Sequence, residues 1–333
     1  MNHQESKKLE TKILTILKRH IQEGDTVVAG ISGGPDSIFL LELLKKLPIK
    51  IIVAHVNHQL RKEAVKDEEF VEKLCHDDCM TNHATILFAP LTSDISSLSL
   101  KSKQGLEETG RKVRYNFFNK LSRKYKAKFI ITAHHADDNL ETIILNFARG
   151  ASLQGLTGMQ EMETSNSSTT SLLRPLLTIS KQEILDFLRF KKLKFRVDKS
   201  NNSLVYKRNF IRHKIIPLLK EINPNISATL SKNTENLREI NEFLKLSAQE
   251  WLKKHTLDET FKKFDAKNFR RLTPALQKNI LLQLHSHHFG HIQNIQSSNI
   301  EETLILINKN IGNKKKKFGL LTIFIKNNII TLV

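Results

Sequence analysis

Residues 26–41, TVVAGISGGPDSIFLL, determine the fold class. The run TVVAGI is β-branched and typical of a strand buried in a parallel sheet, and IFLL begins an apolar helix. SGGPDS joins the two. Two glycines between a strand and a helix let backbone N–H groups approach a phosphate, and the helix N-terminus adds partial positive charge. We therefore expect a phosphate-binding loop made of Ser32, Gly33, Gly34, Pro35, Asp36 and Ser37.

Strand and helix patterns alternate on both sides of this loop. Further buried strands are indicated at residues 49–56, 85–91 and 128–135, and helices at residues 63–78 and 107–126. This alternation predicts an open, mostly parallel sheet with helices on both faces. Ligands of such sheets bind at the carboxyl ends of strands. The polar motifs of this chain follow the strands, at residues 32–37, 55–61 and 134–141.

The second half of the chain changes character. A helix is predicted at residues 180–192, with Ser180 as its N-cap and Glu183 three residues on. The polar stretch at residues 163–171 is typical of a mobile surface loop. A long helix follows, and the chain closes with a predicted hairpin. We predict a catalytic domain at residues 1–222, a linker helix at 223–252 and a small, basic α+β domain at 253–333.

The composition limits the partners. The chain has 53 Lys and Arg against 34 Asp and Glu, a formal net charge of +19. This surplus favours a polyanion such as RNA, and a lysine-rich solvated surface is the alternative. No secretory signal or membrane segment is expected, and two cysteines exclude a disulfide scaffold, so we predict a cytoplasmic protein. Helical spacing of Cys75, Cys79 and His83 is attributed to chance, and we predict no structural zinc.

The glycine loop excludes two common nucleotide motifs. No lysine follows the glycines, so GxxxxGK[ST] is absent, and the spacing is not GxGxxG. SGGPDS instead resembles the pyrophosphatase loop of ATP-dependent adenylating enzymes. With five further strings, taken in order, the chain resembles the tRNA(Ile)-lysidine synthetases over about its first 220 residues. These strings are HVNHQLR (55–61), GRKVRYNFF (110–118), TAHHADDNLET (132–142), RGASLQGLTGM (149–159) and VDKSNNSLVYKRNFIRHKIIPLL (197–219).

This resemblance implies a specific reaction. Enzymes of the family bind ATP and the isoleucine tRNA that carries a CAU anticodon. They transfer AMP to O2 of the wobble cytidine, and the ε-amine of free L-lysine then attacks C2 to give lysidine. Departures from the pattern are small. Gly110 stands where alanine is usual, and Asn202–Ser203 stand where an acidic residue is common.

Candidate catalytic residues follow from the same chemistry. Asp36 is expected to hold Mg²⁺ that bridges the ATP phosphates, and Arg111 and Arg114 are candidates for stabilising the reacting phosphate. An acidic cluster of Asp137, Asp138 and Glu141 is expected to bind the lysine ammonium, with one member accepting its proton. Asp137 is the favoured central residue, and the alternative is ordinary acidic capping of a helix N-terminus. His134 is a candidate phosphate contact or acid, as one of a histidine pair with His135, and His55, Asn57, His58 and Arg61 are candidate nucleotide contacts.

Basic residues are candidates for contact with the tRNA. One group consists of Arg114, Lys207, Arg208, Asn209 and Arg212, and its alternative is a solvated face. Residues 314–317, four lysines, are a second candidate. The resemblance also suggests that residues 253–333 bind tRNA, and it leaves a homodimer open.

Three rival functions differ in what they require. A tRNA thiolase with the same loop needs reactive cysteines, and this chain has two, both on a helix away from the strand ends. A small-molecule synthetase needs an ammonia source and has no use for the positive charge. A non-catalytic RNA-binding protein does not need Asp36 or the acidic cluster. The sequence therefore favours the lysidine-forming ligase.

Overall fold

The computed structural model describes residues 1–59, 63–77, 83–164, 170–197, 207–258, 262–289, 297–309 and 314–332. It divides into two compact units, Met1–Thr142 with Met159–Ser231, and Ile143–Gly158 with Lys232–Val333. The predicted functional boundaries at residues 222 and 252 stay a prediction. None of the helices described is long and apolar enough to cross a membrane.

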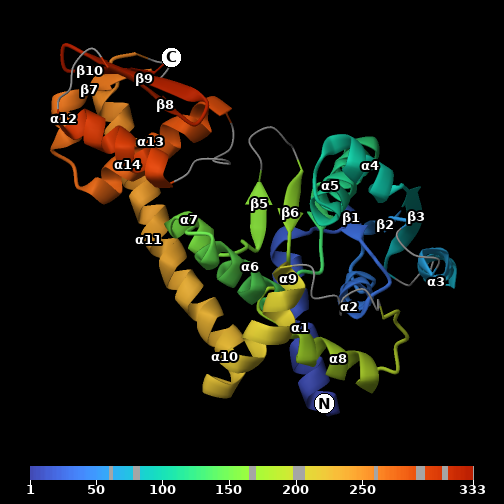
Figure 1. Ribbon diagram of the computed structural model, residues 1–333. Helices are drawn as coiled ribbons and strands as arrows, with labels where there is room; N and C mark the ends of the chain where they lie inside the picture. Colours follow the sequence, from blue (N-terminus) through green and yellow to red (C-terminus); the bar gives the residue numbers. More distant parts are fainter. Residues whose placement is uncertain are drawn as a thin grey trace. The chain divides into compact units, whose positions relative to one another are not determined.

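The helices and strands follow in chain order (Figure 1). Up to the end of the strands of the first unit they are α1 (His3–His20), β1 (Thr26–Gly30), α2 (Pro35–Leu44), β2 (Lys50–Asn57), α3 (Ala64–Asp77), β3 (Thr85–Thr92), α4 (Ile95–Ser102), α5 (Leu106–Tyr125), β4 (Phe129–Ile131), α6 (Ala136–Ala148), α7 (Leu153–Leu156), β5 (Met162–Thr164) and β6 (Ser171–Leu173). The rest are α8 (Lys181–Phe190), α9 (Lys207–Phe210), the π-helical turn η2 (Ile211–Ile215), α10 (Ile216–Ile222), α11 (Ile226–His255), β7 (Lys263–Asp265), α12 (Ala266–Arg270), α13 (Pro274–Phe289), α14 (Ser297–Asn308), β8 (Lys314–Phe318), β9 (Leu321–Lys326) and β10 (Ile329–Leu332).

The first unit contains a six-stranded sheet in the order β3-β2-β1-β4-β6-β5. Its pairs are parallel except for β5 with β6, which is antiparallel. In the register, Val28 lies between Ile52 on β2 and Ile130 on β4. The chain leaves β1 toward β2 on one side and returns to β4 on the other. This is the strand reversal at which open α/β sheets bind ligands, and the predicted fold class is confirmed.

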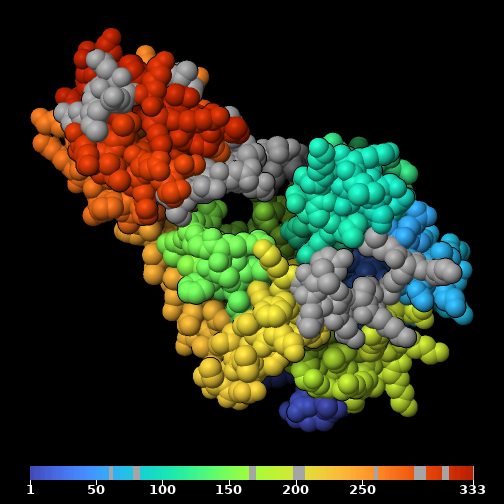
Figure 2. All heavy atoms as spheres, viewed as in Figure 1, coloured from blue at the N-terminus to red at the C-terminus, as the bar shows by residue number. Residues whose placement is uncertain are grey.

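Both faces of this sheet are covered, as its apolar strands require. Val27, Val28 and Ala29 of β1 are all fully buried. Val27 and Ala29 belong to a core formed with α1, α2, α3 and α8, whereas Val28 packs with Phe118 of α5 on the opposite face. Because side chains alternate along a strand, a continuous apolar run supplies two cores at once. In the space-filling view, α4 and α5 (turquoise), α8 (yellow-green) and α9 and α10 (yellow) form much of this unit's visible surface (Figure 2).

The second unit has its own core and a four-stranded antiparallel sheet in the order β7-β10-β9-β8. The predicted closing hairpin is confirmed as β9 and β10. Asn327 and Asn328 adopt positive φ at its tip, as tight hairpins require. The lysine run forms β8, which lies at an edge of the sheet and pairs with β9. Lysines on an edge strand also discourage pairing with another chain, which gives this run a structural role whether or not it binds phosphate.

Several local predictions differ from the structure. The fourth strand ends at Ile131, so the histidines that follow it lie in a loop. Part of the predicted loop at 163–171 is strand, since β5 ends at Thr164 and β6 begins at Ser171, and residues 165–169 lie outside the described residues. Helix α3 ends at Asp77, so His83 does not share its face, and Cys79 is outside the described residues. Cys75 is buried in the core.

Two glycines of the first unit give opposite predictions for substitution by alanine. At Gly110, inside α5, an added Cβ would lie 3.7 Å from His58 Cε1, an ordinary contact. At Gly30 it would lie 2.7 Å from Cζ of the buried Phe118. We expect Gly110→Ala to raise the free energy of unfolding by roughly 0.5–1 kcal/mol, because alanine has the higher helix propensity. Gly30→Ala should lower it by about 1–3 kcal/mol through overpacking. Urea unfolding followed by circular dichroism measures both, and a destabilised Gly110→Ala variant would contradict the packing described.

Candidate functional site

The predicted phosphate loop lies between β1 and α2. Gly33 has φ of 84°, a conformation that glycine adopts without strain. A Cβ there would also lie 3.2 Å from Cγ2 of Val71, so the position is closed to side chains on two grounds. Gly34 is the N-cap of α2 and Pro35 is its first residue. The Ser37 hydroxyl donates to the carbonyl of Gly34 at 2.8 Å. The loop is therefore shaped by its own residues, with the N-terminus of α2 at its end.

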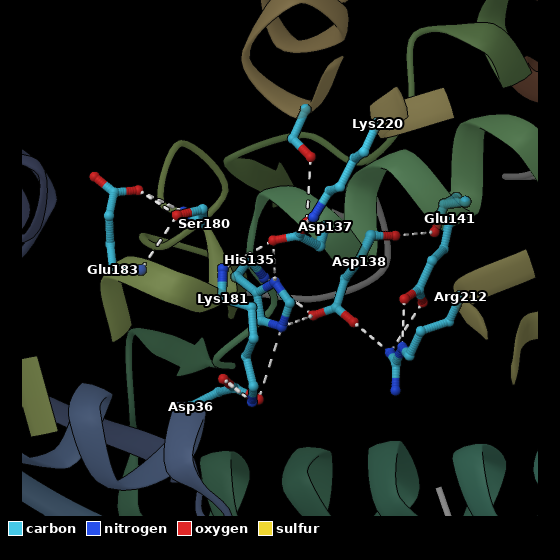
Figure 3. A network of polar contacts seen from close by, with 12 residues as sticks. Asp36, His135, Asp137, Asp138, Glu141, Ser180, Lys181, Glu183, Arg212 and Lys220 are labelled. Carbon is cyan, nitrogen blue, oxygen red and sulfur yellow. Dashed lines mark hydrogen bonds and ion pairs between the residues drawn. The ribbon is translucent and has the colours of Figure 1, made fainter. Parts of the chain in front are cut away.

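Asp36 and Asp137 are joined by a residue that the sequence does not mark. The Lys181 ammonium donates to Asp36 Oδ1 at 2.6 Å. The backbone N–H of the same lysine, which is the first residue of α8, donates to Asp137 Oδ2 at 2.8 Å. Ser227 and Lys220 hold the other oxygen of Asp137 at 3.2 and 3.4 Å. One residue thus connects the phosphate loop to the N-terminus of α6 (Figure 3).

Glu141 and Asp138 are bound by two arginines of the segment 207–222. Arg208 Nε donates to Glu141 Oε2 at 2.5 Å, and Arg212 Nε donates to Glu141 Oε1 at 2.6 Å. Both guanidinium groups also reach Asp138 Oδ1, at 3.2 and 3.3 Å. The Glu141 side chain is only 1% exposed. Arg212 lies in the π-helical turn, a backbone irregularity that often occurs at functional sites.

The network is balanced in charge. Asp36, Asp137, Asp138 and Glu141 face Lys181, Lys220, Arg208 and Arg212, with each carboxylate within 3.4 Å of a cationic nitrogen. Burial alone would raise the pKa of Asp138, but the charges of His135 and Arg208 lower it to about 2. Burial acts in the same direction on Asp137, and the backbone N–H of Lys181 with nearby cations lowers the pKa of that carboxyl below its ordinary value. Both groups are therefore ionised and weakly basic.

The two histidines after β4 have different surroundings. His135 is buried, and its Nε2 lies 3.3 Å from Asp138 Oδ2 and 3.7 Å from Asp36 Oδ2. His134 Nδ1 is 2.8 Å from the hydroxyl of Thr132. Burial, with Arg174, Arg208 and Arg111 nearby, lowers the pKa of His134 to about 3. A neutral His134 ring can hydrogen-bond a phosphate, and it is unsuited to act as an imidazolium acid at neutral pH.

The arginines of helix α5, unlike Arg208 and Arg212, are not paired with the carboxylates of the network. Arg111 and Arg114 are exposed, and neither forms an ion pair with any residue in the described parts of the chain. The Arg111 guanidinium lies 4.8 Å from the centroid of the Tyr115 ring. Arg208 and Arg212, for which the sequence suggests either contact with tRNA or a solvated face, donate to buried carboxylates, and their contact with tRNA stays a prediction. Arg111 and Arg114 are therefore better placed to meet an incoming phosphate.

The remaining predicted residues lie at the end of β2 and in α9. His55 Nδ1 donates to the carbonyl of Ile31 at 2.9 Å, and Asn57 donates to Glu68 at 2.8 Å, so both stabilise the strand end. Burial and the charge of Arg114 lower the pKa of His58 to about 4. Lys207 is exposed and Asn209 is half-buried in α9, and Arg61 lies outside the described residues. Direct roles for these residues stay predictions.

The sequence predicts the acidic residues of the network better than their partners. Asp138 follows a local rule, since it is the third residue of α6 and accepts from the backbone N–H of His135 at 3.1 Å. Lys181 is missed because its contact with Asp36 joins residues 145 positions apart. Only the predicted cap at Ser180, which is confirmed with Glu183, marks the start of α8. Lys220 and Ser227 have no local signal.

The fold and the strand-end loop define the class of protein. A model of the PP-loop domain family matches residues 5–219. Among solved structures, the U34-tRNA thiolase NcsA from Methanococcus maripaludis superposes with a TM-score of 0.57 at 20% identity, over 71% of this chain and 79% of that one. At that identity the likeness shows the fold alone. This chain is a PP-loop protein.

Sequence relatives narrow the class. The chain is 34% identical to the tRNA(Ile)-lysidine synthase of Chlorobaculum tepidum, over 82% of this chain and 82% of that protein. It is 33% identical to the "Bifunctional protein TilS/HprT" of Listeria monocytogenes, over 92% of this chain and 49% of that protein. The chain therefore belongs to the tRNA(Ile)-lysidine synthase family. It spans about half the length of several of these curated relatives.

Removing the central carboxylate tests the network. We expect Glu141→Gln to lower the free energy of unfolding by about 3 kcal/mol, because it leaves two partly buried guanidinium groups without their main partner. Glu108→Gln is the matched control, since Glu108 pairs with Lys112 on the surface of α5 and both side chains are more than half exposed. That change should cost less than about 1 kcal/mol. If urea unfolding shows the same loss in the free energy of unfolding for both variants, Glu141 does not have the stabilising role described here.

The lowered pKa of His134 predicts an acid-sensitive fold. Its pKa is about 3 in the folded protein and 6.5 ordinarily, so between these values the unfolded chain binds the extra proton. The stability contributed by neutral His134 is therefore complete above pH 6.5 and decreases as the pH falls. His134→Asn should flatten the dependence of the urea midpoint on pH between about 4.5 and 7, above the range in which Asp138 titrates. His3→Gln, at an exposed histidine, should leave that slope unchanged, and parallel slopes for all three proteins would refute the assignment.

Proposed function

We propose that this chain catalyses lysidine formation on isoleucine tRNA with a CAU anticodon, using ATP and L-lysine. The main support is that Lys181 contacts both Asp36, through its ammonium, and Asp137, through its backbone N–H. These contacts hold the phosphate loop next to Asp137, at the ends of β1 and β4. A phosphate site and an ammonium-binding carboxylate are thus neighbours, as a reaction between an adenylate and an amine requires. The choice of ATP, L-lysine and isoleucine tRNA in this proposal is supported by the family relationship. A cytoplasmic location is part of this proposal, and a homodimer is compatible with it and not required.

The loop and the arginines account for the first half-reaction. Loop N–H groups and the N-terminus of α2 are suited to the departing pyrophosphate, and Arg111 and Arg114 to the phosphates or the RNA backbone. Asp36 fits a magnesium site, because Mg²⁺ commonly takes one carboxylate together with substrate phosphates. When bound there, the ion would neutralise phosphate charge and make the α-phosphate more electrophilic. Cleavage between the α- and β-phosphates leaves AMP on the cytidine and releases pyrophosphate.

The acidic cluster serves the second half-reaction by charge. Asp137 and Asp138 are ionised throughout the neutral range, so they attract the ammonium of lysine. Their lowered pKa values make them poor proton acceptors, since an amine with an ordinary pKa near 10.4 holds its proton far more tightly. We infer that this cluster orients the lysine and that the proton passes to another acceptor. This modifies the expectation that one of the three acids is the base.

A sulfur-transfer function has no support in the described site. Its nucleophile would be a cysteine thiolate in a polar, accessible place. Cys75 is 3% exposed and packs in the core with Val71 and Ile86. The likeness to a tRNA thiolase extends to the fold alone.

Lysine incorporation tests the proposed function directly. Purified chain is incubated with Mg²⁺, ATP, labelled lysine and isoleucine tRNA transcript, and label retained on the RNA is counted. We expect incorporation into this tRNA and none into a methionine tRNA. Asp36→Asn and Asp137→Asn should each reduce the rate by on the order of 100-fold or more, because charge stabilisation at the reacting groups is lost.

The surface variant Glu108→Gln serves as the activity control and should retain the wild-type rate. Pyrophosphate release that depends on tRNA, without retained label, would preserve adenylation and exclude lysine as the nucleophile. No nucleotide turnover with any RNA would overturn the proposed function.

A further inference from the structure

Lys181 is held at its backbone, while its flexible side chain is partly exposed. Its N–H donates to Asp137, and the cap formed by Ser180 and Glu183 holds the first turn of α8. Its side chain is 36% exposed and ends on Asp36, whose side chain is 27% exposed. A lysine stem has four rotatable carbons, so the ammonium can move around a fixed origin. The pair lies where solvent and solutes reach it.

The ion pairs of Glu141 are built differently. Glu141 is 1% exposed, and two guanidinium groups hold its two oxygens. Such multiple, buried contacts are costly to break, whereas a half-exposed pair between single charges is weak. Within the network, the contact of Lys181 with Asp36 is therefore one that an incoming ion can replace.

Asp36 cannot serve Lys181 and a phosphate-bridging cation equally well. Asp36 Oδ1 already accepts from the ammonium at 2.6 Å, and Oδ2 faces His135 Nε2 at 3.7 Å. Magnesium ligands lie at about 2.0–2.1 Å in a strict octahedron, which leaves little tolerance for a competing cation on the same carboxylate. In the nucleotide-free protein the lysine neutralises Asp36, which would otherwise repel an anionic ligand.

We propose that Lys181 is an exchangeable counter-cation of Asp36, displaced when magnesium and the nucleoside triphosphate bind, and that its released ammonium donates to the phosphate oxygens as they gain charge during cleavage. The identity of the nucleotide rests on the proposed function. Lys181 forms no covalent bond and loses no proton in this exchange. Its charge moves from a carboxylate to phosphates that gain negative charge as pyrophosphate leaves.

Variants with different side chains at position 181 test the exchange by nucleotide binding alone, with no reaction taking place. Binding of adenosine 5′-(α,β-methylene)triphosphate, in which the α–β bridge cannot be cleaved, is measured by calorimetry at increasing Mg²⁺. Lys181→Gln removes the competitor and should lower the Mg²⁺ concentration for half-maximal binding by about two- to fivefold, the range of a half-exposed ion pair. Lys181→Arg can hold the carboxylate with two donors and should raise that concentration by a similar factor. Lys194→Gln removes the charge of an exposed lysine and should match the wild type.

The same variants should separate binding from rate. With saturating Mg²⁺ we expect Lys181→Gln to lower kcat for lysine incorporation roughly 10- to 100-fold, because the phosphates lose a cationic donor, although it needs less Mg²⁺. A purely structural role would not combine an easier magnesium requirement with a slower reaction. Circular dichroism melts of the nucleotide-free variants identify any variant that does not fold. If Lys181→Gln does not fold, the comparison of Lys181→Arg with the wild type still tests the proposal.

Two outcomes overturn the exchange. One is an equal Mg²⁺ requirement in the glutamine, lysine and arginine proteins, and the other is a higher requirement in Lys181→Gln than in the wild type. These titrations contain neither tRNA nor lysine, so they are independent of the reaction assay. If the Mg²⁺ requirement rises from the glutamine to the lysine to the arginine protein but no lysine is incorporated, the exchange is supported and the proposed function is wrong. If lysine is incorporated but the Mg²⁺ requirements do not follow this order, the proposed function is supported and the exchange is wrong.

Discussion

The burial of Glu141 is the constraint on which the arrangement of the site depends. A carboxylate that is 1% exposed requires partners for both oxygens, and Arg208 and Arg212 supply them from a segment far along the chain. Because the same arginines reach Asp138, the segment 207–222 is held against α6. Asp137, one residue earlier, extends these contacts to α8 and α10. Three helices are thus located at the strand ends by four carboxylates and the cations that neutralise them.

Neutralisation inside the network determines where the chain's positive charge acts. The formal net charge is +19, but Arg208 and Arg212 are engaged by acids in the first unit. Charge available to an anion next to the site is carried by Arg111 and Arg114 on α5, and their positive field also helps to keep the nearby histidines neutral. The pKa values of Asp137 and Asp138 are lowered by groups inside the network, chiefly the backbone N–H of Lys181 and the charge of His135 for Asp137, and the charges of His135 and Arg208 for Asp138. The electrostatics therefore favour holding a phosphate and an ammonium side by side over exchanging protons between them.

The sequence predicts this fold well where the rules are local. Buried apolar runs locate β1, β2 and β3 to within about two residues, and the cap at Ser180 and the closing hairpin are correct. Strand β4, of three residues, is shorter than the predicted range 128–135 because the chain leaves the sheet after Ile131, before the two histidines. The π-helical turn at Ile211–Ile215, which contains Arg212 and its contact with Glu141, is not predicted by any periodicity of the sequence. The acidic residues of the site can be predicted from their sequence motif. Lys181 and Lys220 can be assigned to the site only from contacts between distant parts of the chain.

A nucleotide site that also binds an amine must satisfy opposing electrostatic demands. Carboxylates that would hold a metal ion or an ammonium also repel phosphates, and leaving buried carboxylates unpaired would destabilise the free protein. The cations of the network differ in the number of contacts they make. The guanidinium groups of Arg208 and Arg212 each reach both Glu141 and Asp138, whereas the ammonium groups of Lys181 and Lys220 each hold a carboxylate oxygen by one contact. The choice of arginine or lysine at each position thus separates carboxylates held by several contacts, which are costly to break, from carboxylates held by a single and weaker contact.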